Sequence, residues 1–320
     1  MRETRKLQYS ILDYLVFSNT VKGDLGVFDE YKDFRLVLFC MGAYISHWSF
    51  QFSPLYNIDK DIKVAELAEE KFGKGMDYWQ IKGNLQNESM FLFSESNNKE
   101  RAEKINGFLE SVEKAVKGIN ITIVEGDTFQ DISQIYNKSK NIYMLLKENT
   151  IFGETLRISE KQTNKNKAEV TLEFKEDFIL LQNALNNEQT TQARKMLGKI
   201  LMDLSEKQYT QKTLTSVLKK LYITIMQQSD KIKIESDSVE MIVSNSRNYF
   251  DIINYFTELF NEVASANKDV FSDNGQVVNK IEKYIDENYT SRISIYDLAE
   301  KFNFSYSYLC IFFKKYKDIS

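Results

Sequence analysis

Proline is almost absent from this chain, with Pro54 the single one in 320 residues. A proline inside a helix removes a backbone hydrogen-bond donor and clashes with the preceding turn, so its absence leaves helices uninterrupted. Glycine, the other residue that weakens helices, occurs only 12 times. The sequence therefore predicts a helix-rich chain, and this length predicts two or three domains.

Composition narrows the class of protein. Hydrophobic residues make up 42% and charged residues 28%, as in ordinary soluble proteins. The net charge of -4 argues against a generally cationic nucleic-acid coat but not against one local DNA-reading module. Cys40 and Cys310 lie far apart in hydrophobic contexts, which favours a reducing cytoplasm. The strongly apolar run at 36–45 is shorter than the roughly 20 residues of a membrane span, so no membrane segment is expected.

Residues 1–160 alternate between β-rich and amphipathic segments. After an opening helix at 3–17, the pattern predicts a strand at 34–41, a helix at 62–72, strands at 76–82 and 89–94, a helix at 99–117, a strand at 121–124, a helix at 131–148 and a strand at 156–158. The run at 34–41 is almost wholly apolar, which suits a strand buried on both faces. The order of elements predicts a mixed α/β sandwich of about one domain's size.

The rest of the chain divides into two helical parts. A polar stretch at 159–167 is interpreted as a linker, and residues 161–275 as an all-α connector with apolar residues at helical spacing. A second polar stretch, 264–274, separates this connector from a last segment at 276–320.

The segment 276–320 is predicted to form three helices. Ser294 is expected to cap the second, 295–302, because its hydroxyl can accept from unpaired backbone amides, and Ser305 is expected to cap the third. The inward spacing predicts that four side chains are buried together, namely Leu298, Phe302, Leu309 and Phe313. Two short helices across a short turn make a helix-turn-helix, whose second helix lies in the major groove of DNA.

The run ISIYDLAEKFNFS at 293–305, followed by YLCIFFKK at 308–315, resembles the first helix-turn-helix of the AraC family of bacterial transcription regulators. The family's DNA-binding domain holds two such units joined by a long helix, so the resemblance implies sequence-specific binding of double-stranded DNA and a second unit beyond Ser320. The residues that it implies at the DNA are Ser307, Cys310 and Ile311 for the bases, Lys314, Lys315, Ser294 and Ser305 for phosphates, and Tyr306 beside them. An arginine is common in the family where this chain has Ile311, so base readout is expected to be weaker here.

Residues 1–160 are similar, more weakly, to degenerate GGDEF-like regions upstream of AraC-type domains. The resemblance implies a ferredoxin-like α+β fold for signal reception or for pairing of subunits in a homodimer. Active cyclases carry glycines and paired carboxylates in one hairpin, and the corresponding turn here, Gly83–Asn87, has no paired carboxylates. Cyclase activity is therefore not expected, and the chain is predicted not to be an enzyme. The alternative function is a non-catalytic protein-interaction module derived from a nucleotide-cyclase fold.

No other cluster of residues predicts a catalytic, cofactor or metal site. His47 is the only histidine, so a site with several histidines cannot be built. Gly73-Lys74-Gly75 lacks the spacing of a phosphate-binding loop. The two carboxylates of Glu125-Gly126-Asp127 are interpreted as a solvated turn. Seven basic and six acidic residues in 277–320 predict that this chain binds DNA weakly.

Overall fold

The apolar run at 34–41 forms the central strand of a five-stranded sheet in the computed structural model of the chain. This strand, β1 (Phe34–Met41), is buried along its length except at Arg35, which is partly exposed. Because side chains alternate along a strand, Leu36 joins the core on one face of the sheet and Val37 joins the core on the other. The predicted burial on both faces is confirmed.

The other strands flank β1 in the order β2-β3-β1-β4-β5. Neighbouring strands are antiparallel, except that β4 and β5 run parallel. Their bounds are β2 (Tyr78–Lys82), β3 (Glu88–Ser94), β4 (Ile121–Glu125) and β5 (Leu156–Ser159). Each of them corresponds to a predicted strand, with ends shifted by one or two residues.

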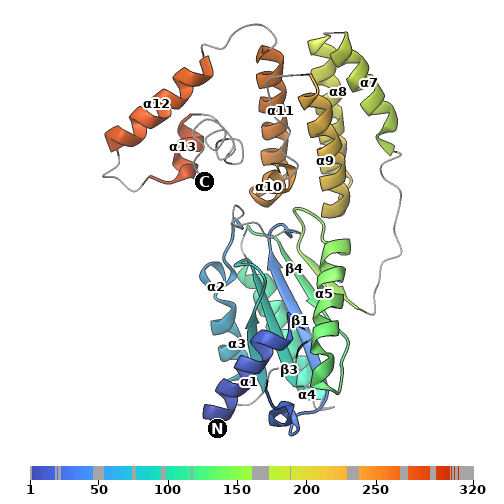
Figure 1. Ribbon diagram of the computed structural model, residues 1–320, viewed down its shortest axis with the longest axis vertical. Helices are drawn as coiled ribbons and strands as arrows, with labels where there is room; N and C mark the ends of the chain where they lie inside the picture. Colours follow the sequence, from blue (N-terminus) through green and yellow to red (C-terminus); the bar gives the residue numbers. More distant parts are fainter. Residues whose placement is uncertain are drawn as a thin grey trace. The chain divides into compact units, whose positions relative to one another are not determined.

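Two pairs of helices cover the sheet, one pair on each face (Figure 1). α1 (Arg2–Leu15) and α5 (Ile135–Asn149) pack on the face that carries Leu36. α3 (Val64–Phe72) and α4 (Lys99–Ala115) pack on the opposite face. The apolar stripe of each amphipathic helix is thereby buried, and the result is three layers around two cores.

The helix predicted at 62–72 is shorter than expected. Lys63 has a φ angle of 50°, in the left-handed region that a continuing right-handed helix does not include, so α3 starts only at Val64. The helix predicted from Asp131 also starts later, because a 3-10 turn comes first. Two short 3-10 helices, η1 (Leu25–Phe28) and η2 (Ile132–Gln134), precede β1 and α5, and a short α-helix, α2 (Ile58–Asp61), precedes α3.

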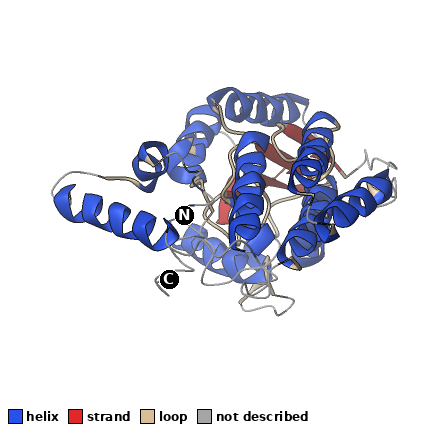
Figure 2. Ribbon diagram, turned by 90° about the horizontal axis from the view of Figure 1, so that it is seen from above, coloured by secondary structure: helices blue, strands red, loops and turns tan. Residues whose placement is uncertain are grey.

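No strand lies among the described residues after 172. Figure 2 shows the strands in red and the helices in blue. This part contains α7 (Lys175–Asn186), α8 (Thr190–Glu206), α9 (Gln211–Met226), α10 (Ser238–Ser244) and α11 (Tyr249–Ala266). α8 packs against α7 and α11, and α9 packs against α10 and α11. Their buried residues recur at helical spacing, as Leu197, Leu201 and Leu204 do in α8.

Two more helices follow, α12 (Asp273–Asn288) and α13 (Ile295–Lys301). α11 continues to Ala266 and α12 starts at Asp273. Both ends of the polar stretch predicted at 264–274 are therefore helical. The predicted segment boundary at 275 falls inside α12, because its polar first turn resembles a linker in sequence.

Contacts between residues divide the chain into two units, Met1–Asn166 and Lys167–Ser320. The first is mixed α/β and the second is helical in its described part. The structure describes residues 2–18, 20, 23–45, 54–73, 77–94, 99–116, 118–160, 173–187, 189–228, 238–266, 273–288, 293–302, 304, 306 and 309. Within these ranges, no helix has both the length and the apolar character that crossing a membrane requires.

Candidate nucleic-acid interface

α13 starts at a capping box. The Ser294 hydroxyl oxygen accepts from the backbone N–H of Asp297 at 3.2 Å, and an oxygen of the Asp297 carboxylate accepts from the backbone N–H of Ser294 at 2.8 Å. These bonds pair backbone amides that the first turn of a helix leaves unpaired. They also lower the pKa of Asp297, chiefly through the backbone hydrogen bond from Ser294. The predicted cap at Ser294 is confirmed.

A small core joins α12, α13 and the residues that follow. Ile281 from α12, Leu298 and Ala299 from α13, and Leu309 form one buried cluster. Leu309 is 0% exposed and Leu298 is 8% exposed. Five partly buried side chains pack around them, namely Tyr284, Ile285, Ile293, Phe302 and Phe304. The predicted burial of Leu298 with Leu309 is confirmed, Phe302 packs at the edge, and Phe313 lies outside the described residues.

The turn after α13 is short and hydrogen-bonded. The Phe302 backbone N–H donates to the Leu298 carbonyl at 3.0 Å, and the Phe304 N–H donates to the Ala299 carbonyl at 2.8 Å. Tyr306 and Leu309, just beyond the turn, are again helical. The second helix of the predicted unit stays a prediction beyond these two residues, because its other positions lie outside the described residues.

An aromatic pair links the two sides of this turn. The rings of Tyr296 in α13 and Tyr306 stack with centroids 4.3 Å apart and planes inclined by 16°. Lys301 at the other end of α13 lies with its Nζ 3.8 Å from the centroid of the Tyr284 ring in α12. Such contacts add to area burial because the ring faces attract cations and offset rings.

Two of the residues that the resemblance implies at DNA are described. Ser294 is exposed, and its hydroxyl donates to the Asp297 carboxylate at 2.7 Å as well as accepting from the backbone. Tyr306 is half-buried against Tyr296. The other six lie outside the described residues, namely Ser305, Ser307, Cys310, Ile311, Lys314 and Lys315. Their roles stay predictions, as does a phosphate contact from Ser294, whose hydroxyl is occupied as a cap.

A buried carboxyl group beside the turn at Gly83–Asn87 escaped the sequence analysis. Glu88, at the start of β3, is 4% exposed, and its carboxylate accepts from the Tyr143 hydroxyl at 2.9 Å and from the Asn84 backbone N–H at 3.0 Å. Burial raises its pKa to about 7. Gly83 allows this arrangement, because a Cβ there would lie 2.2 Å from the Cβ of Glu88. The sequence did contain a signal for this burial: side chains two apart on a strand share a face, and Glu88 is two residues before the apolar Met90.

Within the described part of the chain, no cationic side chain pairs with Glu88. Cys40, directly opposite on β1, is buried, and burial raises the pKa of its thiol. Tyr143 on α5 is partly buried, and this burial raises the pKa of its hydroxyl. Among the described residues, no second carboxylate pairs with Glu88, whose own carboxyl group is bonded to Tyr143 and Asn84. The cluster binds the turn to α5 and is interpreted as structural.

The interpretation of Glu125-Gly126-Asp127 as a solvated turn is wrong for its first residue. Glu125 is only 8% exposed. Its carboxylate accepts from the Nε–H of Arg157 and lies 3.7 Å from a guanidinium nitrogen of Arg35. Two arginines brought from separate strands therefore neutralise this carboxylate, which the local sequence could not indicate. In the described parts of the chain, no group of His, Cys, Asp or Glu side chains could hold a metal ion.

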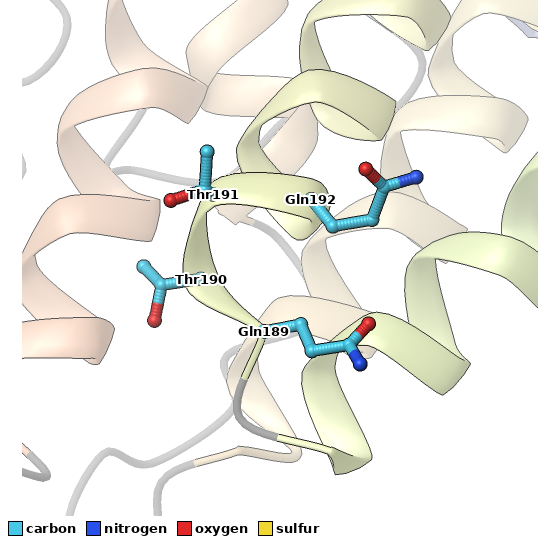
Figure 3. Close-up of a pocket in the computed structure, with 4 residues that line it drawn as sticks. All are labelled: Gln189, Thr190, Thr191 and Gln192. Atoms are coloured by element: carbon cyan, nitrogen blue, oxygen red, sulfur yellow. The ribbon is translucent and has the colours of Figure 1, made fainter.

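A surface hollow lies at the start of α8, lined by Gln189, Thr190, Thr191 and Gln192 (Figure 3). All four side chains are neutral, and none is buried. Nothing in this lining selects a ligand. The interpretations of His47 as structural and of Gly73-Lys74-Gly75 as a loop turn stay predictions, because His47, Lys74 and Gly75 lie outside the described residues.

Comparison with models of protein families, with curated proteins and with solved structures finds no match for this chain. The resemblances to AraC-type and GGDEF-like regions therefore rest on the residues of the chain itself.

Proposed function

We propose that this chain is a sequence-specific DNA-binding transcription regulator of the AraC family, and that it is not an enzyme. The observation that carries the proposal is the common core of α12, α13 and Leu309, around a hydrogen-bonded turn. A helix-turn-helix needs such a core, because the DNA-reading helix must be held in place by the two preceding helices, here α12 and α13. The outer face of the DNA-reading helix then stays free for DNA.

In the proposed complex, α13 crosses the DNA backbone and the helix that contains Tyr306 and Leu309 enters the major groove. Ser307, Cys310 and Ile311 then face base edges, while Lys314 and Lys315 contact phosphates. Because Ile311 cannot donate to guanine as an arginine does, most of the affinity comes from the phosphates, which carry no sequence information.

We propose that residues 1–160 form a ferredoxin-like, degenerate GGDEF-like domain that receives a signal or pairs subunits in the cytoplasm. The strand order β2-β3-β1-β4 and the alternation of strands and helices support this fold. The turn at Gly83–Asn87 supports a role without catalysis, because the carboxyl group next to it, Glu88, is buried and bonded to Tyr143.

A second candidate function is a non-catalytic protein-interaction module. Large apolar side chains are exposed on the second unit, with Phe250 at 66% as the most exposed. The others among the described residues are Ile179 and Leu180 on α7, Met202 on α8, Ile223 on α9 and Ile295 on α13. Exposed apolar side chains favour protein partners, a second copy of this chain among them.

Salt dependence separates the two functions. The purified chain is titrated into a labelled duplex of random sequence between about 50 and 200 mM salt, because binding through several phosphates weakens steeply over this range while apolar association does not. We expect dissociation constants in the non-specific range of about 10⁻⁴–10⁻⁶ M that rise with salt. Self-association that is insensitive to salt, with no binding to the duplex, would support the interaction module instead.

A further inference from the structure

Arg247 lies outside the helix-turn-helix and yet touches it. It belongs to the short connection between α10 and α11, and its side chain is exposed. Its guanidinium carbon lies 4.0 Å from the centroid of the Tyr296 ring, near the start of α13. Both residues belong to the second unit of the chain.

The Tyr296 ring is sandwiched between two flat groups. One is the Arg247 guanidinium and the other is the Tyr306 ring, whose centroid is 4.3 Å from that of Tyr296. Two planar groups at such distances cannot share one face of a ring without overlapping, so they cover opposite faces. Only the Tyr296 ring therefore separates Arg247 from Tyr306. Tyr306 is one of the residues that the AraC resemblance implies at the DNA.

The backbone of Arg247 is also fixed. Its N–H donates to the Asp251 carboxylate at 2.8 Å, and the Asp251 N–H donates to the side-chain oxygen of Asn248 at 3.2 Å. These two bonds lie at the start of α11, and the bond to Asp251 holds the backbone from which the arginine side chain extends. The Asp251 carboxylate is thus engaged with the backbone of Arg247.

The guanidinium keeps its own donors available. Within the described part of the chain it makes no ion pair or hydrogen bond to another side chain, and its contact is the ring of Tyr296. The guanidinium carbon lies over the Tyr296 ring, and a guanidinium carries five N–H donors in a planar fork that matches the oxygens of a phosphate. An exposed arginine fixed in this way is suited to bind an anion.

We propose that Arg247 is a DNA phosphate contact that the helical connector adds to the helix-turn-helix. The proposal rests on the proposed DNA-binding function. The first helix of such a unit crosses the DNA backbone, and Tyr296 lies near the start of that helix. Segment 277–320 carries seven basic and six acidic residues, so one further cation at its edge matters to the attraction of DNA.

The test compares the salt dependence of variants of the full chain on one labelled duplex of about 30 base pairs. Loss of one phosphate contact lowers the slope of log K against log salt by about 0.9. Between about 50 and 200 mM salt, the affinity of wild type should therefore fall about 3-fold more than that of Arg247→Ala. Arg247→Lys, which keeps the charge, should retain most of the wild-type slope.

The matched control is Lys195→Ala. Lys195 is exposed on α8, and its removal changes the net charge by the same amount. Its slope should equal that of wild type. Hydrogen exchange of residues 293–302 provides a second readout and should be the same in Arg247→Ala as in wild type.

Three results overturn the proposal, and they differ in what else they affect. A wild-type slope in Arg247→Ala removes the contact and leaves the DNA-binding function standing. A lowered slope accompanied by faster exchange in 293–302 assigns Arg247 a structural role instead. Absence of salt-dependent DNA binding in wild type removes the proposed function itself, and the contact with it.

Discussion

Replacing Glu88 with glutamine should stabilise the first unit at neutral and alkaline pH. Burial raises the pKa of this carboxyl group from an ordinary value of 4.5 to about 7. An acid with a raised pKa in the folded state contributes stability that is fully present below its unfolded pKa and is lost as the pH rises through the folded pKa. The wild-type protein therefore loses stability between about pH 4.5 and pH 7.

The size of the effect follows from the shift. Each pKa unit corresponds to about 1.4 kcal/mol, so a rise from 4.5 to about 7 corresponds to about 3 kcal/mol. Glutamine is neutral at every pH, and its side-chain oxygen can accept from the Tyr143 hydroxyl and the Asn84 N–H as the protonated acid does. Glu88→Gln should equal wild type near pH 4.5 and exceed it by up to about 3 kcal/mol at pH 8.

Tryptophan fluorescence during urea unfolding measures the difference in unfolding free energy between Glu88→Gln and wild type in the first unit of the chain. Both tryptophans of the chain, Trp48 and Trp79, belong to the first unit, and Trp79 is fully buried. With the usual urea dependence of about 1–3 kcal/mol per M, the midpoint at pH 8 should rise by about 1–3 M. The matched control is Glu70→Gln on the exposed side of α3, which should leave the midpoint unchanged at both pH values. Equal midpoints for wild type and Glu88→Gln at pH 8 would refute the argument from burial.

Three further predictions concern other parts of the chain. Leu309→Ala should cost about 2–5 kcal/mol, because Leu309 is fully buried, and hydrogen exchange in α13 should accelerate while the first unit unfolds as in wild type. Ser294→Ala should cost about 0.5–2 kcal/mol of α13 stability by the same measurement, and Ser294→Gly only a few tenths. The purified chain should not convert GTP to a cyclic dinucleotide; turnover that mutation of Gly83–Asn87 abolishes would contradict this.

The sequence predicted the helices and strands because the spacing of apolar residues that marks each of them can be recognised within a short stretch of chain. The burial of both faces of β1 follows from its nearly continuous apolar run. The capping box at Ser294 and Asp297 follows from two residue types three positions apart. The break at Lys63 did not follow, because a lysine carries no local signal for a positive φ.

The missed polar clusters have the opposite character, since each is made by residues far apart in sequence. Glu88 contacts Tyr143 only because α5 packs on the face of the sheet to which the first residue of β3 points. Glu125 is buried because Arg35 and Arg157 come from strands on either side of β4. A turn that looks solvated in sequence is thus closed by partners that only the strand order brings together.

Arg247 extends this reasoning to the proposed interface. In sequence it is an isolated arginine in a polar connection, and nothing near it suggests DNA. Its significance comes from Tyr296, which lies 49 positions later and presents a ring face that an arginine can cover. The residues quoted for the AraC resemblance begin at 293, so this resemblance has no position for Arg247. If the arginine binds phosphate, the DNA-binding surface of this chain includes part of the helical connector, and movement of α10 against α11 would alter DNA affinity directly.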